Sequence, residues 1–117
     1  MNIEEAVHAH AEWKMKFRGA IAKKAQMDAA SIGRDNCCTI GQWLHGEGKA
    51  RLGAKPEYLR ALNTHKAFHQ QAGRVATMIN AGDYAQAEAS MNAGTPYANA
   101  SNEVAVALIA LKKAANL

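Results

Sequence analysis

The sequence has few aromatic residues, few prolines and few cysteines, and each shortage excludes a class of protein. Aromatic residues make up 6% of the 117 residues, and there are only two prolines and two cysteines. Because Cys37 and Cys38 are adjacent, we expect no disulfide framework of the kind that stabilises small secreted domains. Alanine, which favours helices, is frequent, and proline, which breaks them, is rare. The composition is therefore typical of a helical protein.

Long apolar runs and dense basic runs are also missing. The longest apolar run, Val104 to Leu111, is far shorter than the ~20 residues that cross a bilayer, so we expect no membrane insertion. The N-terminal segment is rich in glutamate and histidine, which predicts a cytoplasmic protein without a secretory signal. The net charge is +4, but lysine and arginine alternate with carboxylates along the chain. Nucleic-acid binding needs clustered cations, and so it is not expected.

The length and the spacing of apolar residues predict one helical domain over residues 1–117. Apolar residues recur at spacings of three and four, which is the helical period. The expected helices run from Asn2 to about Met27, from about Thr39 to His45, from Pro56 to about Ala81, from about Asp83 to Ala93, and from Thr95 to about Ala115. Residues 28–36 and 46–55 are expected to be irregular. The predicted fold is all-α, an antiparallel four-helix bundle with one additional short helix.

The last predicted helix is apolar around more than half of its circumference. Besides its main stripe, Val106, Ile109 and Ala110 extend the apolar surface to one side. Such a helix needs cover on two sides, and we therefore expect a homodimer interface.

Four residues that commonly bind zinc lie in this predicted core. His65 and His69 are one helical turn apart, so their rings project from the same face of a helix. His10 lies on the buried stripe of the first helix, and Cys38 begins the short helix. One thiolate and three imidazoles form a closed tetrahedral shell of the kind that zinc prefers. The alternative is that these are hydrogen-bonded core histidines and a small buried cysteine.

Other residues are expected to shape this site. Trp13 and Trp43 are predicted to pack as core residues and to shield the site from water. Gly41 is expected to allow a close helix approach, and Phe68 packs beside the paired histidines. The two remaining histidines are expected on the surface, namely His8 and His45.

Three motifs resemble those of the chemoreceptor zinc-binding domain family. They are His10-x-x-Trp13, Cys38-x-Ile40-Gly41-x-Trp43-Leu44 and His65-x-x-Phe68-His69, and the resemblance covers nearly the whole chain. It implies that one Zn²⁺ per chain is bound by His10, Cys38, His65 and His69. It also implies a dimeric helical bundle in the bacterial cytoplasm that regulates chemoreceptors or diguanylate cyclases. Cys37 is an additional thiol beside the ligand position. The output domain is expected either in cis, if the chain is a fragment, or in trans.

These features predict a sensory function without enzymatic activity. A closed shell of four protein ligands leaves no position for a substrate, and no other catalytic set is present, so no catalytic residues are assigned. Three ligands lie on long helices, whereas Cys38 lies on a short helix with irregular segments on both sides. We therefore expect Cys38 to be the movable, redox-sensitive ligand. Zinc occupancy, or oxidation of the zinc thiolate, would be signalled to a partner in chemotaxis or related signal transduction.

Two other functions remain open from the sequence. The chain could be a dimerisation module that zinc stabilises without any signalling role. A helical bundle with inward histidines could also hold a di-iron centre or haem. Glu5 and His8 match one half of a di-iron motif, but the apolar stripes contain no glutamate and no haem attachment motif occurs.

Overall fold

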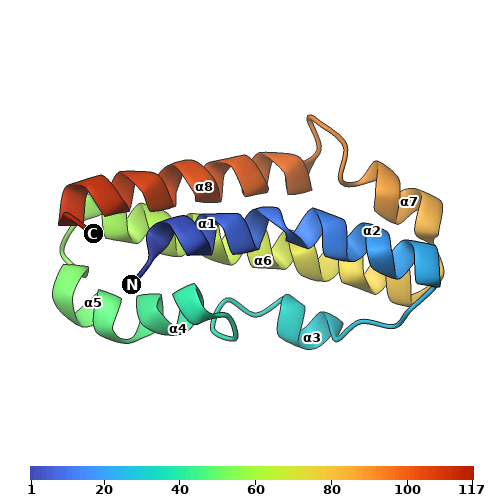
Figure 1. Ribbon diagram of the computed structural model, residues 1–117, viewed down its shortest axis with the longest axis horizontal. Helices are drawn as coiled ribbons and strands as arrows, with labels where there is room; N and C mark the ends of the chain where they lie inside the picture. Colours follow the sequence, from blue (N-terminus) through green and yellow to red (C-terminus); the bar gives the residue numbers. More distant parts are fainter.

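The computed structural model describes residues 1–117 and contains helices and no strand, which confirms the predicted all-α class. The helices are α1 (Ile3–Ala11), α2 (Trp13–Lys23), α3 (Ala29–Ile32), α4 (Thr39–His45), α5 (Glu47–Leu52), α6 (Pro56–Asn80), α7 (Tyr84–Ala89) and α8 (Pro96–Ala115). Three long rods form the body of the molecule: α1 continued by α2, then α6, then α8 (Figure 1). The remaining side is built from α3, α4 and α5, instead of one continuous helix.

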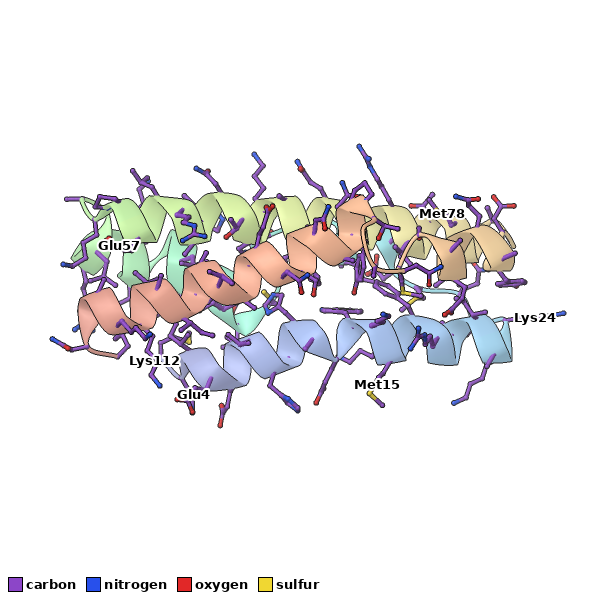
Figure 2. The ribbon with its side chains drawn as sticks, turned by 90° about the horizontal axis from the view of Figure 1, so that it is seen from above. Glu4, Met15, Lys24, Glu57, Met78 and Lys112 are labelled. Atoms are coloured by element: carbon purple, nitrogen blue, oxygen red, sulfur yellow. The ribbon has the colours of Figure 1, made fainter.

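The rods α1–α2 and α6 run in the same direction, and α8 returns against both of them (Figures 1 and 2). The most extensive contact between two helices is that between α6 and α8, and α8 also packs on α1. α3 packs on α6, and α7 contacts the far ends of α2 and α6. None of these helices combines the length and the apolar character that crossing a membrane requires.

The helix starts follow the capping residues that the sequence contains. The side chain of Asn2 accepts a hydrogen bond from the backbone N–H of Glu5 at the beginning of α1. The hydroxyl of Thr95 accepts one from the N–H of Ala98, and Pro96 occupies the first turn of α8. Each cap satisfies a backbone donor that has no partner within the helix.

The connecting segments contain more helix than the sequence predicts. The first rod is irregular at Glu12 and ends at Lys23, because Lys24 adopts a left-handed conformation with φ of 52°. The predicted loop at residues 28–36 contains α3, which Asp28 caps, and the glycine-rich stretch contains α5. α7 is shorter than expected, ending at Ala89. Helices of four to six residues are too short to show a clear apolar period, which explains the difference.

The core lies between the three rods and continues directly into the histidine cluster. Phe17 and Phe68 both contact Tyr97, with ring centroids 6.0 and 5.7 Å apart. Phe68 also meets His10 edge-on at 5.2 Å. The aromatic core thus forms one wall of the candidate site.

Candidate metal centre

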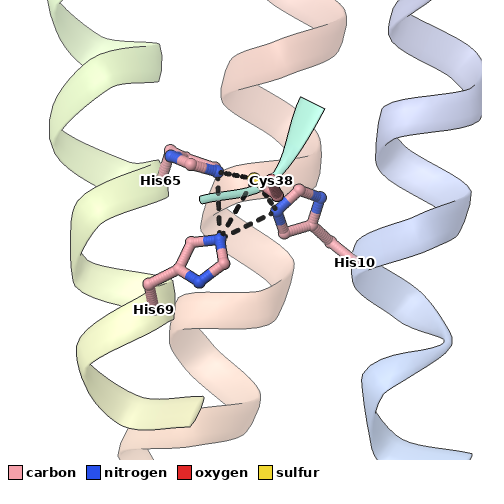
Figure 3. A group of neighbouring side chains, drawn as sticks. All are labelled: His10, Cys38, His65 and His69. Atoms are coloured by element: carbon pink, nitrogen blue, oxygen red, sulfur yellow. Dashed lines mark hydrogen bonds between the residues drawn. The ribbon is translucent and has the colours of Figure 1, made fainter. Parts of the chain in front are cut away.

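The structure brings together all four residues that the sequence singled out. His65 and His69 project from successive turns of α6, and His10 projects from α1 toward them (Figure 3). Cys38, which is the N-cap residue of α4, reaches the same point. The three histidines are 4%, 0% and 2% exposed, in chain order, whereas Cys38 is only half-buried. One ligand atom from each residue lies within 4.8 Å of all the others.

The distances within this cluster fit a tetrahedral metal. The Nε2 atom of His69 lies 3.1 Å from that of His65 and 3.3 Å from that of His10. The Cys38 sulfur lies 3.2, 3.5 and 3.9 Å from the Nε2 atoms of His65, His69 and His10. Usual zinc bond lengths require edges of about 3.3 Å between two nitrogens and about 3.6 Å between nitrogen and sulfur. Five of the six edges of the cluster thus lie within about 0.4 Å of those of a zinc shell, and the sixth, between His10 and His65, is within 4.8 Å.

Hydrogen bonds to backbone carbonyls orient two of the three imidazoles. His10 Nδ1 lies 2.7 Å from the carbonyl oxygen of Ala6, and His69 Nδ1 lies 2.8 Å from that of Ile32. Because a carbonyl only accepts, Nδ1 must carry the proton, and the Nε2 lone pair then points at the cluster centre. His65 Nδ1 is buried without a partner.

The electrostatic environment favours a bound cation. Burial, together with the neighbouring imidazoles, lowers the pKa of His65 to about 2. Burial also lowers the pKa of His10 and of His69, so all three rings are neutral at pH 7. Burial raises the pKa of the Cys38 thiol, although the backbone amides at the start of α4 oppose this. Three imidazole lone pairs and a sulfur thus face one another in the core. A divalent cation that binds nitrogen and sulfur would bind all four of these atoms at once.

Close glycine contacts hold the backbone around the cluster. A Cβ atom on Gly41 would lie 1.9 Å from the carbonyl oxygen of Asp35 and 3.0 Å from the ring of His65, so this position requires glycine. The backbone that approaches Gly41 belongs to the turn at Asp35, whereas the sequence predicts an approach between helices. A Cβ atom on Gly73 would lie 2.8 Å from the Cα atom of Gly33. Because neither residue has a side chain, α3 can pack closely against α6.

The contact between α3 and α6 was missed by the sequence analysis, and it serves the site. It places the carbonyl of Ile32, the last residue of α3, where His69 donates to it. The one available signal was a glycine at position 73 inside a strongly helical stretch, since such a glycine often marks close packing.

The other predicted neighbours divide between the site and its supports. Phe68 meets His69 edge-on at 5.5 Å, and Trp13 stacks on Phe17 with centroids 5.4 Å apart. Trp43 packs against Gly48, where a Cβ atom would lie 2.9 Å from its ring. Both tryptophans are only half-buried at the edge of the core, where Trp13 packs on Phe17 and Trp43 joins α4 to α5.

The two remaining histidines are exposed, as the sequence predicts. His8 lies 2.7 Å from Glu12, its neighbour on the next turn. His45, at the end of α4, lies 2.9 Å from the carboxylate of Asp35. This second pair ties α4 to the segment before Cys38.

A cleft reaches the cluster from the surface. It has a volume of about 540 Å³ and lies between α1 and the segment that leads into α4. Its walls include His10, Trp13, Lys16, Cys37 and Cys38. The cleft gives small molecules a path to the sulfur of Cys38, while the two histidines of α6 do not line it.

The comparisons with known proteins agree with this chemistry. No curated protein and no solved structure matches the chain. The family described as the chemoreceptor zinc-binding domain matches residues 10–76, which is more than half of the chain and includes all four clustered residues. This chain belongs to the chemoreceptor zinc-binding domain family.

Proposed function

We propose that this chain is a sensory domain in which Cys38 and three histidines hold one Zn²⁺, and in which the state of Cys38 controls the position of α4. The family match and the geometry of the four donors support the metal. Bound zinc would keep the sulfur of Cys38 as a thiolate. All four positions of the shell are filled by protein atoms, so we propose a regulatory role and no enzymatic activity.

The observation that carries this proposal is the unequal anchoring of the four ligands. His10 and the two histidines of α6 are buried on long rods. Cys38 is half-buried at the N-cap of α4, and the five residues before it are not helical. Loss of the bond to Cys38 therefore frees the one ligand that the core does not fix.

The anchoring of α4 differs from the sequence-based expectation at its other end. α5 begins at Glu47, directly after Gly46, so no long irregular segment follows α4. The hydroxyl of Tyr58 on α6 donates a 2.6 Å hydrogen bond to the carbonyl of Leu44, and Trp43 packs against Gly48. We therefore propose that α4 pivots about its C-terminal end when Cys38 is released.

Amide hydrogen exchange tests this pivot directly. In zinc-loaded full chain, chelation of the metal should accelerate exchange in residues 36–42 and leave residues 43–52 nearly unchanged. The variant Cys38→Ala should resemble the chelated protein without any chelator. Equal exchange of residues 36–42 in both states would contradict the pivot and would favour an inert, zinc-stabilised module.

A partner must read this movement, and we propose two contacts for it. The first is a signalling output of the chemoreceptor or diguanylate cyclase type, in cis or in trans, in the bacterial cytoplasm. The second is another copy of this chain. Three large apolar side chains support a homodimer: Leu59 on α6 is 50% exposed, and Val106 and Ile109 on the adjacent α8 are 54% and 42% exposed.

The donor set gives no support to a di-iron centre. Such a site needs several carboxylates, and the cluster of His10, Cys38, His65 and His69 contains none. Glu5, the residue that matched half of the motif, is exposed on α1.

A further inference from the structure

A second thiol lies beside the cysteine of the cluster. Cys37 is exposed, and it lines the same cleft as Cys38. Cys37 and Cys38 lie in a bend that leads into α4. The Cys38 sulfur faces the histidines, whereas that of Cys37 lies 3.7 Å from the side chain of Asn36.

We propose that Cys37 is the resolving thiol of this site and that oxidation of Cys38 ends in a disulfide between these two neighbouring residues. This inference rests on the proposed function, in which Cys38 is the releasable ligand. Both cysteines line the cleft, so a small peroxide that enters it would meet either residue. Residues 1–117 contain no other cysteine.

The reaction needs a hydroperoxide as the oxidant and proceeds in two steps. The thiolate of Cys38 attacks one peroxide oxygen, so an S–O bond forms, the O–O bond breaks, and hydroxide leaves. The thiolate of Cys37 then attacks the sulfur of the resulting sulfenic acid, so the S–S bond forms and a second hydroxide leaves. One hydroxide takes up the thiol proton of Cys37 and the other takes up a proton from solvent, because zinc has already displaced the proton of Cys38. In sum, one hydrogen peroxide is reduced to two waters, one thiolate and one thiol are oxidised to one disulfide, and the zinc ion is released.

The disulfide and the metal shell exclude each other. A sulfur bonded in a disulfide carries no thiolate charge for a metal, and the Cys38 sulfur has to leave its place 3.2 Å from His65 Nε2 to reach the sulfur of Cys37. Closing the bridge must therefore turn the 37–38 segment and displace the first residue of α4. In this way the chemical change at sulfur becomes a movement of the helix proposed to carry the signal.

Such a bridge would also be easy to reverse. Neighbouring Cα atoms are about 3.8 Å apart, whereas relaxed disulfides join Cα atoms about 4.4–6.8 Å apart. A strained disulfide is reduced readily by cellular thiols. Without Cys37, the sulfenic acid of Cys38 would continue to sulfinic acid, which cellular thiols do not reverse. Cys37 thus converts a damaging oxidation into a resettable one.

Mass spectrometry of the full chain distinguishes these outcomes. Zinc-loaded wild-type protein and Cys37→Ser would be treated with hydrogen peroxide, with zinc release followed by a colorimetric chelator. The wild type should lose two hydrogens within the peptide that contains both cysteines, release its zinc, and regain both thiols and zinc after dithiothreitol. Cys37→Ser should instead gain two oxygens at position 38, and reduction should not restore zinc binding. Cys37→Ala provides the same comparison if the serine variant folds poorly.

Two results would overturn the inference without touching the zinc site. The first is that wild type and variant give the same oxidation product, or that neither protein reacts with hydrogen peroxide. The second is a disulfide between two chains in place of the bridge within one chain. The zinc content of both proteins before oxidation reports on the proposed function separately, since failure there would show less than one zinc per chain.

Discussion

Substitution of Gly41 by alanine should disturb the site without removing a ligand. The new Cβ atom would lie 1.9 Å from the carbonyl oxygen of Asp35, whereas an ordinary contact is about 3.4 Å. Either the Asp35 backbone or α4 must therefore shift by about 1.5 Å. Metal ligands keep their positions to within about 0.2 Å, so a shift of this size so close to Cys38 cannot leave the shell intact.

The substitution should lower two quantities, the free energy of unfolding and the affinity for zinc. Overpacking of this kind costs about 1–3 kcal/mol of the free energy of unfolding. Misplaced support of a metal ligand typically weakens metal affinity about 10–100-fold. Urea unfolding in the presence of a chelator measures the first quantity, and competition with a zinc chelator of known affinity measures the second.

Gly19→Ala is the matched control for this substitution. A Cβ atom on Gly19 would meet nothing within 4 Å, and the residue lies inside α2. Alanine there should raise the free energy of unfolding by about 0.5–1 kcal/mol through helix propensity and leave zinc affinity unchanged. Wild-type stability and zinc affinity in Gly41→Ala would refute the close contact between the Asp35 segment and α4.

Two further predictions concern pH and assembly. Burial lowers the pKa of the three clustered histidines from 6.5, to about 2 for His65, so below pH 6.5 the unfolded zinc-free chain binds more protons than the folded chain. The zinc-free fold should therefore lose up to about 2 kcal/mol through His65 between pH 6.5 and pH 5, and further stability through His10 and His69. An equal free energy of unfolding in urea at both pH values would contradict this. Ile109→Lys should shift the protein from dimer to monomer in analytical ultracentrifugation, whereas Met15→Lys on the exposed face of α2 should not; a monomeric wild type would disprove the interface.

The long helices and the clustered residues could be predicted because both depend on regular spacing. The four-residue step from His65 to His69 and the position of His10 on a buried stripe place three imidazoles in the core. The predicted bounds of α4, α6 and α8 agree closely with the structure because local signals mark them: Gly46 follows α4, Pro56 begins α6, and Thr95 with Pro96 begins α8.

What could not be predicted depends on contacts between segments that are far apart in the sequence. The carbonyl of Ile32 reaches His69 only because Gly33 and Gly73 let α3 and α6 approach closely. The C-terminal end of α4 is held by the hydrogen bond from Tyr58 and by the contact of Trp43 with α5. α5 is too short to show an apolar period. Burial of this kind is decided by packing, which no local pattern reports.

X-ray absorption at the zinc edge of the reconstituted full chain tests the central claim most directly. We expect one zinc per chain with three imidazole nitrogens at about 2.0–2.1 Å and one sulfur at about 2.3 Å. The single sulfur should vanish from the spectrum in Cys38→Ala and persist in Cys37→Ser. A shell with two sulfurs, or with an oxygen in place of the sulfur, would contradict a site formed by His10, Cys38, His65 and His69.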